Sequence, residues 1–321
     1  MTAEALLEVR GLGIAVADGR GAAEGAGSPP AAREAGSPPE RAHRPLVRDL
    51  SFSVAPGERV GLIGESGSGK SLSSLAIQGL LPAGLEASGS VRLAGVETVG
   101  APDARLRPLR GPVAGMVFQE PMTALDPLMR VGRQVGEPLR RHLGLRGAEL
   151  ARSVAEVLAE VRLEDPRLAR AYPHELSGGQ RQRVAIAVAI AARPRLLIAD
   201  EPTTALDVTV QSEILDLLDR LVAERGTGLL FISHDLAVVS RMTDRVHVLR
   251  GGACVEEGPV DAILREPRDP YTAQLVAHAR ALDAALDGDG PRGPRGDGTG
   301  ARGSDGAVGP LAEADTDEGE R

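Results

Sequence analysis

A glycine-rich loop offers the first candidate chemistry in this sequence, and it runs Gly64-Glu65-Ser66-Gly67-Ser68-Gly69-Lys70-Ser71. Glycines at 64, 67 and 69 allow a tight turn in which successive backbone N–H groups point at one anion. Such a loop before a helix is typical of a site for the phosphates of ATP, with Lys70 on the β- and γ-phosphates and the Ser71 hydroxyl on Mg²⁺. The alternative is a glycine-rich turn that binds nothing, but residues 59–63 suit a buried strand and residues 71–81 a following helix.

Two acidic residues follow an apolar run further along the chain. Residues 196–199 are all apolar, and Asp200 and Glu201 come directly after them. Such a run suits a central parallel strand, which would hold both carboxylates at its C-terminal end beside the glycine-rich loop. We expect Asp200 to be an outer ligand of Mg²⁺ and Glu201 to orient or deprotonate the attacking water. Taken alone, the pattern also fits a strand that ends in a solvated acidic turn.

A Ser-Gly-Gly turn is a second candidate anion site, within Leu176-Ser177-Gly178-Gly179-Gln180. It opens a helix expected over residues 181–192, whose free N–H groups and dipole favour an anion. His234 follows the apolar run 229–232, where a lone histidine is more often only a polar strand end.

These motifs and their order resemble the ATP-binding cassette (ABC) family over residues 5–277. The resemblance equates residues 64–71 with the Walker A loop, Gln119 with the Q-loop glutamine, residues 176–180 with the signature, residues 205–207 with the D-loop and His234 with the switch histidine. It implies an ATPase whose catalytic residues are Lys70, Gln119, Glu201 and His234. It also implies a magnesium site of Ser71, Gln119 and Asp200, and nucleotide contacts from residues 64–71, Gln119, residues 177–180 and Asp207.

In that family two cassettes close head to tail. The resemblance therefore implies that Ser177 and the backbone of Gly178 and Gly179 touch the γ-phosphate bound on the other subunit. His234 would stabilise the transferring phosphoryl group and hold the attacking water with Glu201.

Further residues narrow the resemblance to importers of the oligopeptide, dipeptide and nickel type. They are residues 119–127, 171–175, 206–211 and 269–272. The resemblance implies a peripheral subunit at the cytoplasmic face of the inner membrane, which powers uptake of short peptides through two permease subunits fed by an extracytoplasmic binding protein. Gln119 would sense the γ-phosphate and report it to the permease. Nickel or another small solute stays open as the cargo, and the second cassette can be a copy or a paralogue.

Composition agrees with a globular cytosolic component. The chain has 321 residues, 42% of them hydrophobic, and no run of eighteen apolar residues, and its first residues lack the pattern of a signal peptide. The net charge of −8 argues against a nucleic-acid partner. The one cysteine, Cys254, cannot form an internal disulfide and is expected to be a small buried hydrophobe.

Two segments look foreign to the fold, and two positions depart from the family pattern. Residues 17–45 and 281–321 have too few bulky apolar residues to form a core, so we expect a disordered insertion and a disordered tail. Val16 stands where cassettes usually place an aromatic residue that stacks on adenine. Asp269 stands where relatives often carry histidine, and the sequence offers no reason for it.

The fold class follows as α/β, a P-loop NTPase of the ABC type. Residues 6–16, 46–54 and 89–93 predict a small antiparallel sheet, and the strands that precede Gly64, Asp200 and His234 predict a parallel core sheet. Residues 120–180 predict a helical subdomain carrying the signature, with helices over 131–142 and 149–161. A hairpin turning at Gly251 and Gly252 closes the core.

The sequence argues against two alternative classes of protein. A soluble cassette ATPase that acts on DNA or ribosomes usually has two cassettes or a long coiled coil, and the chain has neither a second Walker A loop nor sustained heptads between Lys70 and Ser177. A non-hydrolysing binding subunit would be expected to lose Lys70, Glu201 or His234, and all three are present.

Overall fold

The computed structural model describes residues 5–17, 45–204 and 206–286. Residues 18–44 of the expected insertion and most of the expected tail lie outside the described residues, as does Ala205 of the D-loop. No helix in the described part of the chain is long and apolar enough to cross a membrane.

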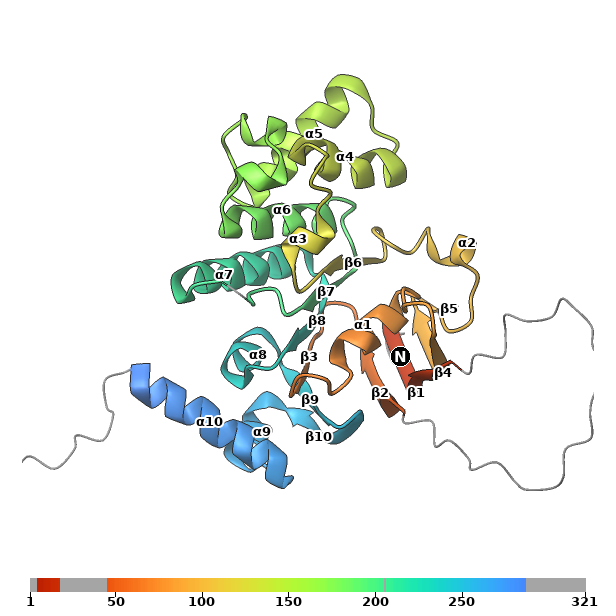
Figure 1. Cartoon of the computed structure of the whole chain (residues 1–321), viewed down its shortest axis with the longest axis vertical. Helices are drawn as coiled ribbons and strands as arrows, with labels where there is room; N and C mark the ends of the chain where they lie inside the picture. Colours follow the sequence, from red (N-terminus) through yellow and green to blue (C-terminus); the bar gives the residue numbers. More distant parts are fainter. Residues whose placement is uncertain (1–4, 18–44, 205, 287–321) are drawn as a thin grey trace, which may run out of the picture. The chain divides into compact units, whose positions relative to one another are not determined.

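The core is a six-stranded sheet in the order β10-β9-β3-β8-β7-β6 (Figure 1). Its neighbours pair in parallel except β9 and β10. The strands are β3 (Arg59–Gly64), β6 (Ala114–Val117), β7 (Leu196–Asp200), β8 (Gly228–Ser233), β9 (Arg245–Arg250) and β10 (Ala253–Pro259). The β9–β10 hairpin turns at Gly251 and Gly252 with φ of 54° and 85°, the positive angles that a two-residue turn of this twist requires.

Alternating side chains of the central strands enter two separate cores. In β7, Leu197 and Ala199 join the core that contains most of the helices, and Leu196 and Ile198 join the core under the antiparallel sheet. β8 divides in the same way, and every residue of both strands is buried. Because both faces are covered, these strands are continuous apolar runs in the sequence.

The second sheet is antiparallel and has the order β2-β1-β4-β5. Its strands are β1 (Leu7–Val16), β2 (Val47–Val54), β4 (Leu85–Leu93) and β5 (Val96–Glu97). β4 begins at Leu85 and not at residue 89 as expected, because Gly89 forms an irregularity inside the strand. Its φ is 85°, and a Cβ there would lie 2.2 Å from the Gly11 carbonyl oxygen.

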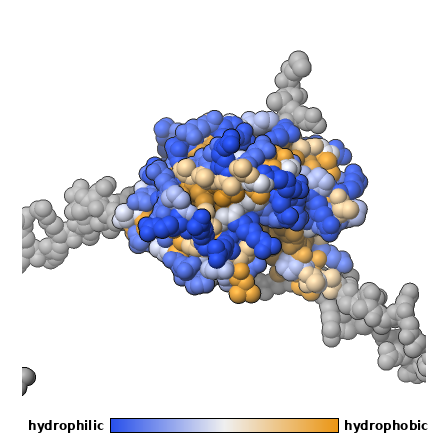
Figure 2. Space-filling model, turned by 90° about the horizontal axis from the view of Figure 1, so that it is seen from above, coloured by the Kyte–Doolittle hydropathy of each residue, from blue (hydrophilic) through white to orange (hydrophobic). Residues whose placement is uncertain are grey.

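Helices complete the two cores and carry the signature region. They are α1 (Lys70–Ile77), α2 (Asp103–Leu106), α3 (Pro121–Ala124), α4 (Val131–His142), α5 (Gly147–Glu160), α6 (Gly178–Ile190), α7 (Val208–Arg225), α8 (Leu236–Met242), α9 (Val260–Arg265) and α10 (Pro270–Leu286), with 3₁₀ turns at Leu168–Arg170 and Pro173–Glu175. The segment from α3 to α6 forms the expected helical subdomain above the core sheet in Figure 1. The face seen in Figure 2 is mostly hydrophilic, with small apolar patches.

Several expected helix bounds were wrong, and two of these differences have a clear local cause. α1 ends at Ile77 and not at residue 81, because Gly79 (φ 61°) donates to the Ala76 carbonyl and Leu80 to the Leu75 carbonyl, which terminates the helix. α6 begins at Gly178 and not at residue 181, because Ser177 caps it. α10 runs to Leu286, so residues 281–286, expected to open the tail, are helical.

Candidate nucleotide-hydrolysis site

The glycine-rich loop joins β3 to α1, and its tight course requires glycine at two positions. A Cβ on Gly64 would lie 2.1 Å from the carbonyl oxygen of Leu249, and one on Gly69 would lie 2.6 Å from a methyl group of Val47. Gly69 also has a φ of 96°. The backbone therefore passes closer to β9 and β2 than any other residue would permit.

Lys70 is buried in the loop that precedes it. Its Nζ donates to the carbonyl oxygens of Gly64 (2.7 Å) and Glu65 (2.9 Å), and the residue is 4% exposed. Desolvation lowers the pKa of Lys70, and the nearby carboxylates of Glu201 and Asp200 oppose that shift. Ser68 is also buried, and its hydroxyl has no partner among the described residues. A caged cation and an unpaired hydroxyl within one loop suit an anionic ligand.

Asp200 ends β7 directly beside the start of α1. Its carboxylate accepts hydrogen bonds from Ser71 Oγ (3.1 Å) and Ser74 Oγ (3.2 Å). Burial raises the pKa of Asp200, while the two hydroxyl bonds favour its charged form. Ser71 and Asp200 thus place two hard oxygen donors side by side, which fits Mg²⁺. Ser74 was not expected, although its position three residues after Ser71 puts both on one helix face.

Two of the predicted catalytic residues, Gln119 and His234, lie beside the Glu201 carboxylate. Its Oε2 accepts from Thr204 Oγ1 (2.9 Å) and Gln119 Nε2 (3.3 Å), and it lies 3.3 Å from His234 Nδ1. Gln119 follows β6 and His234 follows β8, so the C-terminal ends of three adjacent strands supply this cluster. Thr204 was missed at the sequence level, where only its spacing from Glu201 could have pointed to it.

The signature turn is a helix cap in this chain. Ser177 Oγ accepts from the Gln180 N–H (3.3 Å), and the Gln180 side chain accepts from the Ser177 N–H (3.0 Å). Asp207 likewise caps α7 by accepting from the Val210 N–H (2.9 Å). Within the described residues, no hydrogen bond joins the signature turn to the glycine-rich loop.

Val16 lies at the end of β1 and is 57% exposed. The position expected to stack on adenine therefore carries an accessible aliphatic side chain.

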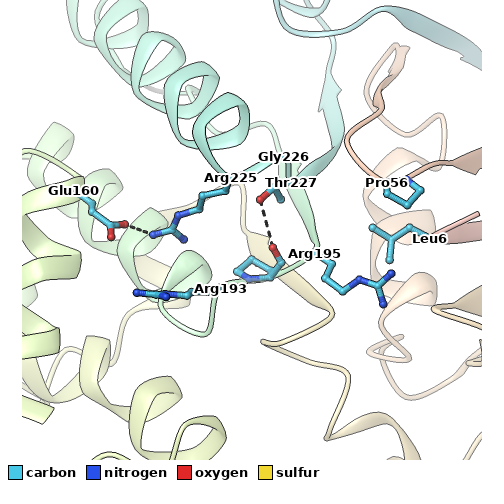
Figure 3. A pocket seen from close by; sticks show the side chains of 9 residues that line it. Leu6, Pro56, Glu160, Arg193, Arg195, Arg225, Gly226 and Thr227 are labelled. Carbon is cyan, nitrogen blue, oxygen red and sulfur yellow. Dashed lines mark hydrogen bonds and ion pairs between the residues drawn. The ribbon is translucent and has the colours of Figure 1, made fainter. Parts of the chain in front are cut away.

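A cavity of about 500 Å³ lies at the opposite end of the core strands (Figure 3). Arg195 immediately precedes β7 and Thr227 immediately precedes β8, whereas the glycine-rich loop and Glu201 follow the C-terminal ends of strands. In the cavity Glu160 is paired with Arg225, and the side chains of Arg193 and Arg195 diverge. This cavity lies away from the predicted nucleotide site, and none of the predicted site residues lines it.

A cluster of possible metal ligands, His247, Cys254 and Glu257, lies on β9 and β10. His247 Nδ1 is 2.9 Å from Glu257 Oε2 and 4.0 Å from Cys254 Sγ, and His247 Nε2 is 2.8 Å from Arg245 Nη1. Arg245 donates to Nε2, so the neutral ring keeps its proton on Nδ1 for Glu257. The ring then has no lone pair free for a metal. Burial raises the pKa of the half-buried Cys254 thiol to about 11, so it stays neutral.

The fold, together with the glycine-rich loop and the acidic pair Asp200 and Glu201, defines a P-loop nucleotide hydrolase with an inserted helical subdomain. A family model described as ABC transporter matches residues 47–204. A Brucella ovis relative, provisionally named a peptide import ATP-binding protein, is 50% identical over 249 residues, which cover 75% of this chain and 74% of the relative. The Mycobacterium tuberculosis oligopeptide transport ATP-binding protein OppD is 49% identical over 241 residues, 74% of this chain and 39% of that protein.

A solved structure agrees with these relatives. The ATP-binding cassette MJ0796, solved as a dimer in a post-hydrolysis state bound to ADP and Pi, matches with a TM-score of 0.63 and 28% identity over 79% of this chain and 98% of its own. The chain belongs to the ABC transporter family and is an ATPase of that family.

Proposed function

We propose that this chain is the ATP-hydrolysing subunit of an importer for short peptides. The cluster of Gln119, Thr204 and His234 around Glu201, beside Lys70 and Asp200, carries the hydrolytic part of the proposal. The names of the Brucella and Mycobacterium relatives support the peptide cargo.

The loop residues bind the triphosphate. Lys70 exchanges its two carbonyl partners for phosphate oxygens, and the Ser68 hydroxyl gains a partner that it lacks among the described residues. Ser71 and Asp200 would hold Mg²⁺, which neutralises phosphate charge when bound. Burial of Lys70 and Asp200 strengthens these contacts, because charges interact more strongly away from water. Gln119, the third expected ligand of Mg²⁺, donates to Glu201 through its Nε2.

Glu201 orients and deprotonates the attacking water. Thr204 and Gln119 donate to its Oε2 and so fix the direction of the carboxylate. His234, at 3.3 Å, is placed to share the water and to stabilise charge on the transferring phosphoryl group. Positioning and charge stabilisation account for this chemistry without a covalent intermediate.

A second cassette completes each site. The related cassette MJ0796, solved as a dimer, supports an assembly in which Ser177, Gly178 and Gly179 face the γ-phosphate bound by the partner. Two permeases and an extracytoplasmic binding protein are the further partners we propose, with the cassette peripheral at the cytoplasmic face of the inner membrane.

The substitution Glu201→Gln tests this assignment. The amide keeps the shape of the carboxylate but cannot accept a proton, so we expect ATP to bind and hydrolysis to fall by at least about a hundredfold. Hydrolysis and bound nucleotide are measured together. Lys70→Ala should instead lose nucleotide binding, and Glu149→Gln on the exposed side of α5 should match the parent. Unchanged hydrolysis in Glu201→Gln would exclude Glu201 as the base.

A further inference from the structure

Helix α10 reaches the glycine-rich loop through one buried tyrosine. The Glu65 backbone N–H donates to the Tyr271 hydroxyl at 2.7 Å, although the two residues are 206 positions apart. The tyrosine is 7% exposed, and the Arg250 guanidinium lies over its ring, 5.0 Å from the centroid. A residue outside the recognised nucleotide motifs therefore contacts the loop directly.

The start of α10 is held so that this contact forms. Asp269 Oδ1 accepts from the N–H groups of Tyr271 (2.8 Å) and Thr272 (3.4 Å), which caps the helix. The Glu256 carboxylate on β10 accepts from the N–H groups of Arg268 (2.9 Å) and Asp269 (3.0 Å). These bonds give Asp269 the structural role that the sequence did not reveal.

The backbone that Tyr271 contacts also holds Lys70. The Glu65 N–H bonded to Tyr271 belongs to the peptide that joins Gly64 to Glu65, and the Gly64 carbonyl oxygen of that same peptide accepts from Lys70 Nζ (2.7 Å). The next carbonyl oxygen, that of Glu65, accepts from Lys70 Nζ (2.9 Å) and from the Ser68 N–H (3.2 Å). Movement of the Gly64–Glu65 peptide would therefore shift both the ammonium and the loop that must cradle phosphates. Tyr271 holds this peptide in place.

The geometry points to Tyr271 as a positioning residue for the triphosphate. Its hydroxyl holds the Gly64–Glu65 peptide and keeps the loop in its binding shape before ATP arrives, which lowers the ordering cost of binding. Its contacts are with the Glu65 N–H and the Arg250 guanidinium and not with Glu201. We therefore expect it to set the affinity for ATP and to leave the rate of the bound complex unchanged.

Tyr271→Phe removes the hydroxyl and keeps the ring under Arg250. One hydrogen bond contributes about 0.5–1.5 kcal/mol, so we expect the KM for ATP to rise about two- to tenfold, with kcat within about twofold of the parent. The matched control is Tyr172→Phe, because the chain contains two tyrosines and this one contacts Arg130 and His174 instead. A fall in kcat with KM unchanged, or no change in either, would overturn the role, as would equal effects in both variants.

A spectroscopic readout tests the contact itself. Tyr172→Phe leaves Tyr271 as the sole tyrosine, so labelling tyrosine with ¹³C at Cζ alone gives one NMR resonance that reports this site. Added MgATP should shift that resonance in a saturable way when Glu201→Gln blocks turnover, and Lys70→Ala should abolish the shift. A resonance that MgATP leaves in place would refute the proposal. Both readouts depend on ATP and not on the transported solute. They therefore stay interpretable if the solute proves not to be a peptide.

Discussion

Glu201 occupies a backbone conformation that favours glycine. Its φ is 45°, and its N–H donates to the Ile232 carbonyl at 2.9 Å, one residue beyond the end of β7. The left-handed conformation turns the chain after the strand, and the carboxylate meets donors from two other segments. Glu201 thus combines a strained backbone with a carboxylate that accepts hydrogen bonds from Gln119 and Thr204. Strain at a functional position is expected where the placement of a side chain is kept at a cost to fold stability.

We expect base selectivity to depend on a different residue, Val16. An exposed aliphatic side chain cannot stack on adenine as an aromatic ring does, and base stacking contributes on the order of 1–3 kcal/mol in nucleic-acid complexes. We predict that ATP and GTP bind within about threefold of each other, as measured by competition for the site. Val16→Tyr should favour ATP, with Val255→Tyr, at another exposed valine, as the control. A strong preference of the parent chain for ATP would contradict the prediction.

At the scale of elements, the motifs could be predicted because each depends on adjacent residues. The loop after β3, the acidic pair after β7 and the histidine after β8 follow from strands ending at one edge of a parallel sheet. Gln180 and Asp207 show the limit of this reasoning: their side chains make helix caps, which sequence alone does not distinguish from a ligand contact. The contact of Tyr271 with the glycine-rich loop could not be predicted from the sequence, because only tertiary packing brings α10 to that loop.

The β9–β10 hairpin gives the fold a pH-dependent element. Burial lowers the pKa of His247 to about 4, and Arg245 adds to the shift, while Glu257 and Glu58 oppose it. Since the unfolded value is about 6.5, the unfolded chain binds more protons between these values, and stability falls as pH drops from about 6.5 to 4. We expect a loss on the order of 3 kcal/mol from this group, with no further loss from it below pH 4.

Denaturant unfolding across this pH range measures the effect. His247→Gln should flatten the slope between pH 6.5 and 4, whereas His278→Gln, at an exposed position of α10, should keep it. Equal slopes in the parent and His247→Gln would show that the histidine does not carry the dependence, whatever the absolute stability of the variant.

At the scale of the whole molecule, the proposed assembly places the glycine-rich loop of one chain opposite the signature turn of a second cassette, so a working site needs two chains. Under the same proposal the transported solute does not contact the cassette, which is why the residues of the site do not distinguish peptide import from import of nickel or another small solute.

Extraction of the tagged chain from its native cells in mild detergent tests the assembly. Glu201→Gln with ATP should hold the closed state, and mass spectrometry should recover two multi-spanning permeases and, where the pair is mixed, a second cassette. Peptides on an associated binding protein would establish the cargo, whereas bound nickel would replace peptide with metal as the substrate. Lys70→Ala serves as the control, because without nucleotide it should recover less of the partner cassette. Ribosomal or DNA-bound partners without any membrane protein would overturn the transport function and leave a soluble ATPase, since the hydrolytic site serves either class.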